Sequence, residues 1–111
     1  MIDLNELCKV TLSNAELRNK NDGNIKIDTR SMLKHTATEV VEATEAYSKF
    51  QSAIYTEFAL GDYVDHFASE LADIICCVLI IACKENINIE KAVLDCIEKN
   101  RKRAEGIGDK L

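Results

Sequence analysis

Apolar and polar residues alternate along most of this chain with the period of an α-helix, and short polar segments divide the pattern into four stretches. The first stretch spans about residues 3–20. It begins with Asp3 and Glu6 in the arrangement of a capping box, and it ends in the polar segment 19–24. The pattern therefore predicts a first helix at the N-terminus and an all-α fold.

The second predicted helix starts near Asp28 or Thr29 and continues past Tyr47 and Phe50, with its end before Gly61 left open. Residues spaced three and four apart form a mainly apolar stripe along it: Leu33, Ala37, Val40, Val41 and Thr44. A stripe with this spacing is typical of a helix face that packs against another element. We therefore expect this face to be buried.

The third predicted helix starts between Asp62 and Asp65 and runs to about Glu85. Its second half contains the run IICCVLIIAC, residues 74–83, which is apolar on every side and must be covered on every side. Four helices of one short chain can hardly supply that cover, so we expect a dimer or larger assembly. A membrane span needs about 20 apolar residues, so we expect a core helix and no membrane contact.

The fourth predicted helix begins after Asn88, which can act as its N-cap, and ends in the basic segment 99–103. The whole chain has 111 residues, no Pro and four Gly, which suits a single helical domain over residues 1–111. Its net charge of −5 argues against a nucleic-acid partner. The five cysteines form no CxxC motif, so we expect small buried side chains in a reducing, cytoplasmic environment.

Two acidic pairs, Glu39-x-x-Glu42 and Glu70-x-x-Asp73, have the same spacing in two different predicted helices. Residues three apart lie on nearly one helix face, so two neighbouring helices would bring four carboxylates together. Repulsion and desolvation oppose such a gathering, and a hard divalent cation resolves the conflict. An all-carboxylate set selects Mg²⁺, Mn²⁺ or Ca²⁺ over zinc, and we expect these four residues to bind Mg²⁺, with Mn²⁺ as a possible substitute.

The alternative is that these acids are ordinary solvated side chains, which are common on acidic helices. Two pairs that each border apolar surface favour the metal site over that alternative. Glu45 points about 120° away from Glu39 and is the weaker candidate for ligation. His66 lies one turn before Glu70, within reach of the site, but we expect it in the first turn of its helix and facing water.

The basic segment at the end of the fourth helix contains candidate phosphate-binding residues: Lys99, Asn100, Arg101 and Arg103. Cations in a last turn are also favourable to the helix dipole, which is the alternative explanation. Beside a carboxylate metal site, however, a basic segment indicates a polyphosphate substrate. No Gly-rich phosphate loop is present, so side chains and metal would have to bind the phosphates.

These motifs, over about residues 30–103, resemble those of the MazG-like all-α nucleoside triphosphate pyrophosphohydrolases, whose pattern is E-x-x-E on one helix and E-x-x-D on the next. The resemblance implies a four-helix bundle completed by oligomerisation into a homodimer or homotetramer. It implies Mg²⁺-dependent cleavage of a (d)NTP to (d)NMP and pyrophosphate, often as nucleotide-pool house-cleaning. It assigns Glu39, Glu42, Glu70 and Asp73 to the metal and Asn100 with Arg103 to the substrate.

For that reaction we expect metal-activated water to attack phosphorus and Glu39 or Glu42 to accept its proton. Relatives often carry a lysine where this chain has Cys96. Some relatives also carry aromatic residues ahead of the first motif, and the corresponding residues 22–32 of this chain contain none. The base specificity is therefore open. We rank a non-catalytic helical module that binds nucleotide or a protein partner second, and a metal-free bundle third.

Overall fold

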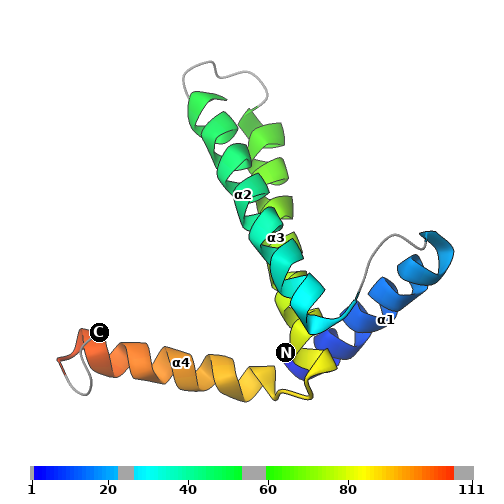
Figure 1. The fold of residues 1–111 in the computed structure, drawn as a ribbon. Coiled ribbons are helices and arrows are strands. Elements are labelled where there is room, and N and C mark those ends of the chain that lie inside the picture. The colour runs from blue at the N-terminus through cyan, green and yellow to red at the C-terminus, as the bar shows by residue number, and fades with distance from the viewer. Residues whose placement is uncertain (1, 23–26, 54–59, 107–111) are drawn as a thin grey trace.

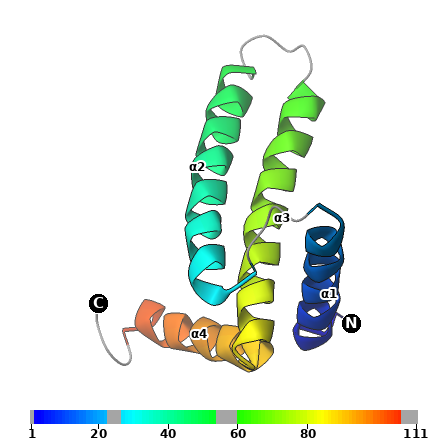
Figure 2. The same ribbon diagram turned by 45° about the vertical axis from the view of Figure 1, so that its right-hand side comes forward.

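The computed structural model describes residues 2–22, 27–53 and 60–106, and these form four α-helices, which confirms the all-α prediction. The helices are α1 (Leu4–Asp22), α2 (Thr29–Ala53), α3 (Leu60–Lys84) and α4 (Ile89–Ala104). Helices α2 and α3 lie side by side as a long antiparallel hairpin (Figures 1 and 2). Helix α1 packs against the C-terminal half of α3, and α4 leaves the end of α3 and extends away from the hairpin.

Three helices begin where the sequence predicts, because a polar side chain accepts N–H groups of the first turn at Asp3, Asp28 and Asn88. The Asp3 oxygen accepts from the Glu6 backbone at 3.3 Å, while the Glu6 carboxylate pairs with Lys9. Helix α3 begins at Leu60, earlier than predicted, with Gly61 inside its first turn instead of before the helix.

The core consists of two small clusters around α3. Cys8 packs with Leu79 and Ala82, and a second cluster consists of Met32, Cys77 and Ile80. Burial raises the pKa of the Cys8 and Cys77 thiols, as expected for cysteines that serve as small apolar side chains.

The remaining cysteines are less buried than the sequence predicts. Cys76 and Cys96 are exposed and Cys83 is half-buried, and all five thiols are free. Cys76 lies on the exposed face of α3, and Cys96 lies on α4, of which no residue is buried. The expectation of buried cysteines is thus right for Cys8 and Cys77 only.

The face of α2 that meets α3 differs from the predicted stripe. It buries alanines, Ala43, Ala46 and Ala53, whose small side chains allow the two helices to approach closely. Larger members of the predicted stripe are exposed, among them Leu33 at 56% and Val41 at 57%. The expectation that this stripe is buried is wrong for the single chain, because the alanine face already occupies the contact with α3.

The single chain is open. Its radius of gyration is 17.1 Å, whereas a compact domain of this length has a value of about 13 Å. By length and composition alone, Gly61–Lys84 in α3 would suffice to cross a membrane, a property shared by core helices, and only 22% of its most apolar window is buried. The helices of one chain therefore leave much apolar surface uncovered.

Helix α4 contacts the rest of the chain mainly at its N-terminal end. The Asn5 side chain on α1 donates to Asn88 Oδ1 at 2.9 Å and accepts from the Glu90 backbone N–H at 3.3 Å. Beyond this junction α4 buries no residue, and its apolar side chains Leu94 and Ile97 are 61% and 59% exposed. One amide side chain thus links the beginnings of α1 and α4.

Candidate functional site

Helices α2 and α3 bring three acidic side chains together, as their spacing predicts. Glu39, Glu70 and Asp73 each offer a carboxylate oxygen within 4.8 Å of the other two. Glu39 is buried at 8% exposure, Glu70 is half-buried and Asp73 is exposed. Glu42 is exposed on α2 and lies outside this group, although its carboxyl is close enough to influence Glu39.

The electrostatics of this acidic cluster (Glu39, Glu70 and Asp73) are unfavourable without a cation. The Oε2 atoms of Glu39 and Glu70 are buried and have no hydrogen-bond partner in the described part of the chain. Burial raises the pKa of the Glu39 carboxyl, and the carboxylates of Glu42 and Asp73 raise it further, while His35 opposes the rise. Carboxylate oxygens with these unmet needs fit a hard divalent cation such as Mg²⁺.

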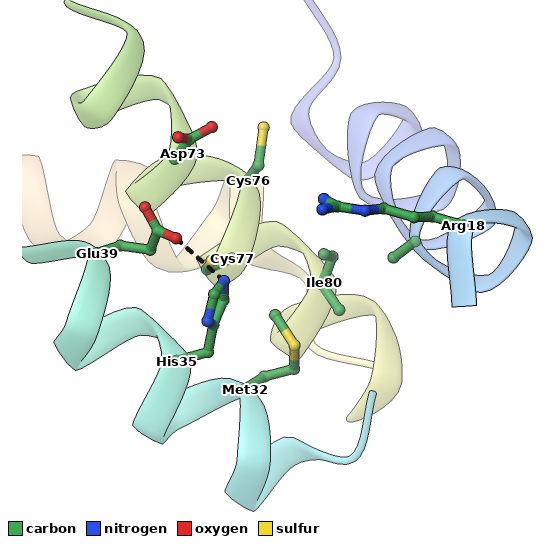
Figure 3. Close-up of a pocket in the computed structure, with 9 residues that line it drawn as sticks. Arg18, Met32, His35, Glu39, Asp73, Cys76, Cys77 and Ile80 are labelled. Carbon is green, nitrogen blue, oxygen red and sulfur yellow. Dashed lines mark ion pairs between the residues drawn. The ribbon is translucent and has the colours of Figure 1, made fainter. Parts of the chain in front are cut away.

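Two histidines contact the leading acid of each pair. The His35 Nε2 lies 3.1 Å from Glu39 Oε1, and the His66 Nε2 lies 3.8 Å from Glu70 Oε1 (Figure 3 draws the first contact). His66 is 52% exposed, yet it stands in the second turn of α3 with its ring nitrogen toward Glu70. The sequence-based prediction gives no role to His35. The available signal is a histidine four residues before the first acid of each motif, His35 before Glu39 and His66 before Glu70.

A cavity of about 190 Å³ adjoins the acidic cluster between α1, α2 and α3. Figure 3 shows the side chains that line it: Ala15, Arg18, Met32, His35, Glu39, Asp73, Cys76, Cys77 and Ile80. Arg18 extends from α1 toward the side of the cavity where Cys76 lies. The cavity therefore places a guanidinium, two of the acids and apolar surface around one space. No local motif marks Arg18, so the sequence alone did not identify it.

The basic segment of α4 is not brought to the acidic cluster within one chain. Helix α4 directs its C-terminal end away from the α2–α3 hairpin (Figures 1 and 2). Arg101 pairs at 2.7 Å with both Glu98 and Glu105 of its own helical region. The Asn100 amide lies 3.8 Å from the Cys96 sulfur, while Lys99 is exposed and Arg103 is half-buried.

Residues 28–107 match a family model described as the MazG nucleotide pyrophosphohydrolase domain. The match covers more than two thirds of the chain, including α2, α3 and α4, and leaves α1 outside. No curated protein and no solved structure matches the chain.

Proposed function

Because this chain belongs to the MazG nucleotide pyrophosphohydrolase family, we propose that it cleaves a nucleoside triphosphate to the monophosphate and pyrophosphate with Mg²⁺ as cofactor. One observation carries the proposal. Two buried carboxylate oxygens, Oε2 of Glu39 and of Glu70, lack partners within the described residues and belong to a cluster that Asp73 completes. Such a cluster costs folding free energy unless a cation binds there.

In this proposal Glu39, Glu70 and Asp73 would hold the metal, and Glu42, which is exposed on α2, would be the fourth carboxylate. Bound Mg²⁺ supplies polarisation of a phosphoryl oxygen and a water of lowered pKa. Glu42 is the acid of the four outside the cluster and is exposed beside Glu39. We therefore place acceptance of the water's proton at Glu42, with Glu39 as the neighbouring alternative.

The adjoining cavity suits part of the substrate. Arg18 offers a fixed positive charge at its border, and Met32 and Ile80 offer apolar contacts for a flat base. The phosphates would lie toward Glu39 and Asp73, where the cavity meets the acidic cluster. Neither the cavity nor the acids select a particular base, and the proposal covers ribo- and deoxyribonucleotides alike.

We further propose that a second copy of the chain completes the site, in a homodimer or homotetramer. Helices α2, α3 and α4 expose apolar side chains that a partner chain would cover. The radius of gyration of 17.1 Å is that of an open chain, against which a second copy could pack. The basic segment of α4, with Lys99, Asn100, Arg101 and Arg103, would then bind phosphates beside the acids of another copy. We propose that protein, and not lipid, covers α3, because the carboxylates of Glu70 and Asp73 on this helix would be costly to place in a bilayer.

The proposed setting is the cytoplasm, as part of nucleotide-pool house-cleaning. Five free thiols suit a reducing compartment, and the triphosphate substrates occur there.

A product panel tests the proposal. Canonical and modified nucleoside triphosphates are incubated with the protein and Mg²⁺, and products are separated by ion-exchange chromatography. The expected products are monophosphate and pyrophosphate, absent with Glu70→Gln and retained with the exposed control Glu45→Gln. Release of diphosphate and inorganic phosphate would contradict α–β cleavage. Heat of nucleotide binding in calorimetry without any product would instead support the non-catalytic module, to which the exposed Cys96 beside Asn100 gives some weight.

A further inference from the structure

We infer that His35 and His66 are a matched pair of positioning residues, each of which orients the leading carboxylate of one metal-binding motif. The inference rests on the proposed function, since it concerns the same carboxylates. It assigns a role to two residues that lie outside the acidic motifs themselves.

The two motifs share a longer pattern than the acidic pairs alone. On α2 the order is His35, Glu39 and Glu42, and on α3 it is His66, Glu70 and Asp73, with spacings of four and three residues in both. Side chains four apart on a helix lie one turn above each other on the same face. The hairpin therefore carries the same arrangement on each of its two helices.

Each histidine contacts one oxygen of its glutamate and leaves the other oxygen unmet. The Nε2 atoms lie 3.1 Å and 3.8 Å from the Oε1 atoms of Glu39 and Glu70. The opposite oxygens, both Oε2, are the two buried side-chain atoms without a partner in the part of the molecule that the structure describes. In both glutamates, therefore, Oε1 lies near a histidine and Oε2 has no hydrogen-bond partner among the described residues.

This arrangement fixes the direction of the unmet oxygens. The last torsion of a glutamate has a broad energy profile, so a carboxylate held by no neighbour samples many orientations. An imidazole against one oxygen restricts that torsion and leaves the other oxygen in a defined place. Glu39 and Glu70 are both members of the cluster that Asp73 completes.

The chemistry of histidine suits this role better than that of a permanent cation. A lysine or arginine at either position would cancel charge that attracts the divalent ion and would compete with it for the carboxylate. An imidazole offers a ring N–H to the carboxylate without the permanent charge of those two side chains. Glu39 is the more buried acid and has the shorter contact, so His35 is the more influential of the two.

Mn²⁺ binding to the purified protein, measured by electron paramagnetic resonance of the free ion, tests the inference without any turnover. We expect His35→Ala to raise the Kd for Mn²⁺ by about 10- to 100-fold and His66→Ala by a smaller factor. His35→Gln keeps an N–H donor within reach of Glu39 and should restore most of the affinity, whereas His35→Asn is too short and should not. Lys34→Ala, at the exposed neighbouring position, is the matched control and should bind as the wild type does.

The Gln and Asn variants separate positioning from folding, because both substitutions are uncharged and stand at the same place in α2. Equal Mn²⁺ affinity in the wild type and both alanine variants would overturn the inference and leave the proposed function intact. Equal weakening by Gln and Asn would also overturn it, since a retained donor would then make no difference. A wild-type protein that binds no Mn²⁺ would overturn the proposed function together with the inference.

Discussion

The α2–α3 hairpin and helix α4 both carry charged residues that the sequence singles out, but the structure treats these charges in opposite ways. In the hairpin, Glu39 is buried, its pKa is raised by burial, and one of its oxygens lacks a partner within the described residues. In α4, Arg101 is exposed and pairs with Glu98 and Glu105 of its own helical region.

This contrast separates two kinds of charged cluster. The α4 ion pairs are local, solvent-exposed and worth little on their own, so they need no ligand to explain them. In the hairpin, by contrast, the Oε2 atoms of Glu39 and Glu70 are buried without a hydrogen-bond partner among the described residues. The hairpin acids could therefore hold a cation without help from another chain. The basic segment of α4 acquires a binding role only once another chain or a ligand lies against it.

The strongest test of the hairpin half removes one acid charge from the cluster. Asp73→Asn should lower kcat/KM for pyrophosphate release by about 10³-fold or more, because the metal loses a ligand that no neighbour replaces. Glu45→Gln on α2 is the matched control and should retain wild-type activity. Full activity of Asp73→Asn would show that the cluster is ordinary surface charge, like that of α4.

The next test concerns the exposed apolar face of α4. If a second copy covers that face, Ile97→Asp should weaken the assembly by about 2–3 kcal/mol, through loss of apolar burial and desolvation of a charge. Sedimentation velocity would show smaller particles, with activity that falls on dilution. Lys91→Gln, exposed on the same helix, should leave the assembly unchanged. If Ile97→Asp sediments as the wild type does, α4 lies outside any interface.

A smaller effect is expected from the basic segment itself. Arg103→Ala should raise KM about tenfold through loss of one charge-assisted phosphate contact, with a lesser change in kcat. Steady-state kinetics with the preferred triphosphate would measure it. Lys102→Ala is the control from the same turn. If both variants raise KM equally, the basic segment acts through its net charge and not through a specific contact of Arg103.

The smallest effect concerns pH and the metal-free protein. The raised pKa of Glu39 means that its favourable contribution to folding is present below about pH 4 and is lost as pH rises through the raised value. The Glu39→Gln variant does not suffer that loss. Near pH 7 its melting temperature should be on the order of 4 °C above that of the wild type, for a gain of about 1 kcal/mol in stability. At acid pH the two proteins should melt at the same temperature.

Added Mg²⁺ should reverse this difference, because it stabilises the wild type by binding and leaves Glu39→Gln largely unaffected. Differential scanning fluorimetry across pH, with and without Mg²⁺, would follow both effects. Glu45→Gln should show neither. A metal-free Glu39→Gln protein that melts below the wild type at pH 7 would contradict the argument from burial.

The elements that the sequence predicted well depend on local chemistry. Helix beginnings at Asp3, Asp28 and Asn88 follow from side-chain oxygens that reach the next turn, and local sequence is enough to find them. The convergence of Glu39, Glu70 and Asp73 required one further step, the pairing of two consecutive helices, which short connections favour.

The features that the sequence did not reveal depend on which faces meet. Alanines and the Val41 stripe both have helical spacing, and only the packed hairpin shows that Ala43 and Ala46 face α3. Arg18 reaches the cavity because α1 docks on α3, a long-range contact without a local signature. His35 has no distinctive local signature either, since a histidine one turn from an acid is common on solvated helices.

The junction between Asn5 and Asn88 attaches α4 to α1 at one end of the helix, so a small rotation there displaces the other end by a larger distance. Helix α4 has 16 residues, so it is about 24 Å long, and its attachment to α1 lies at one end. A rotation of about 10° at that end moves the other by about 4 Å, which is more than the length of a hydrogen bond. The position of the basic segment is therefore sensitive to the contacts of Asn5, Asn88 and Ile89 at the opposite end of its helix.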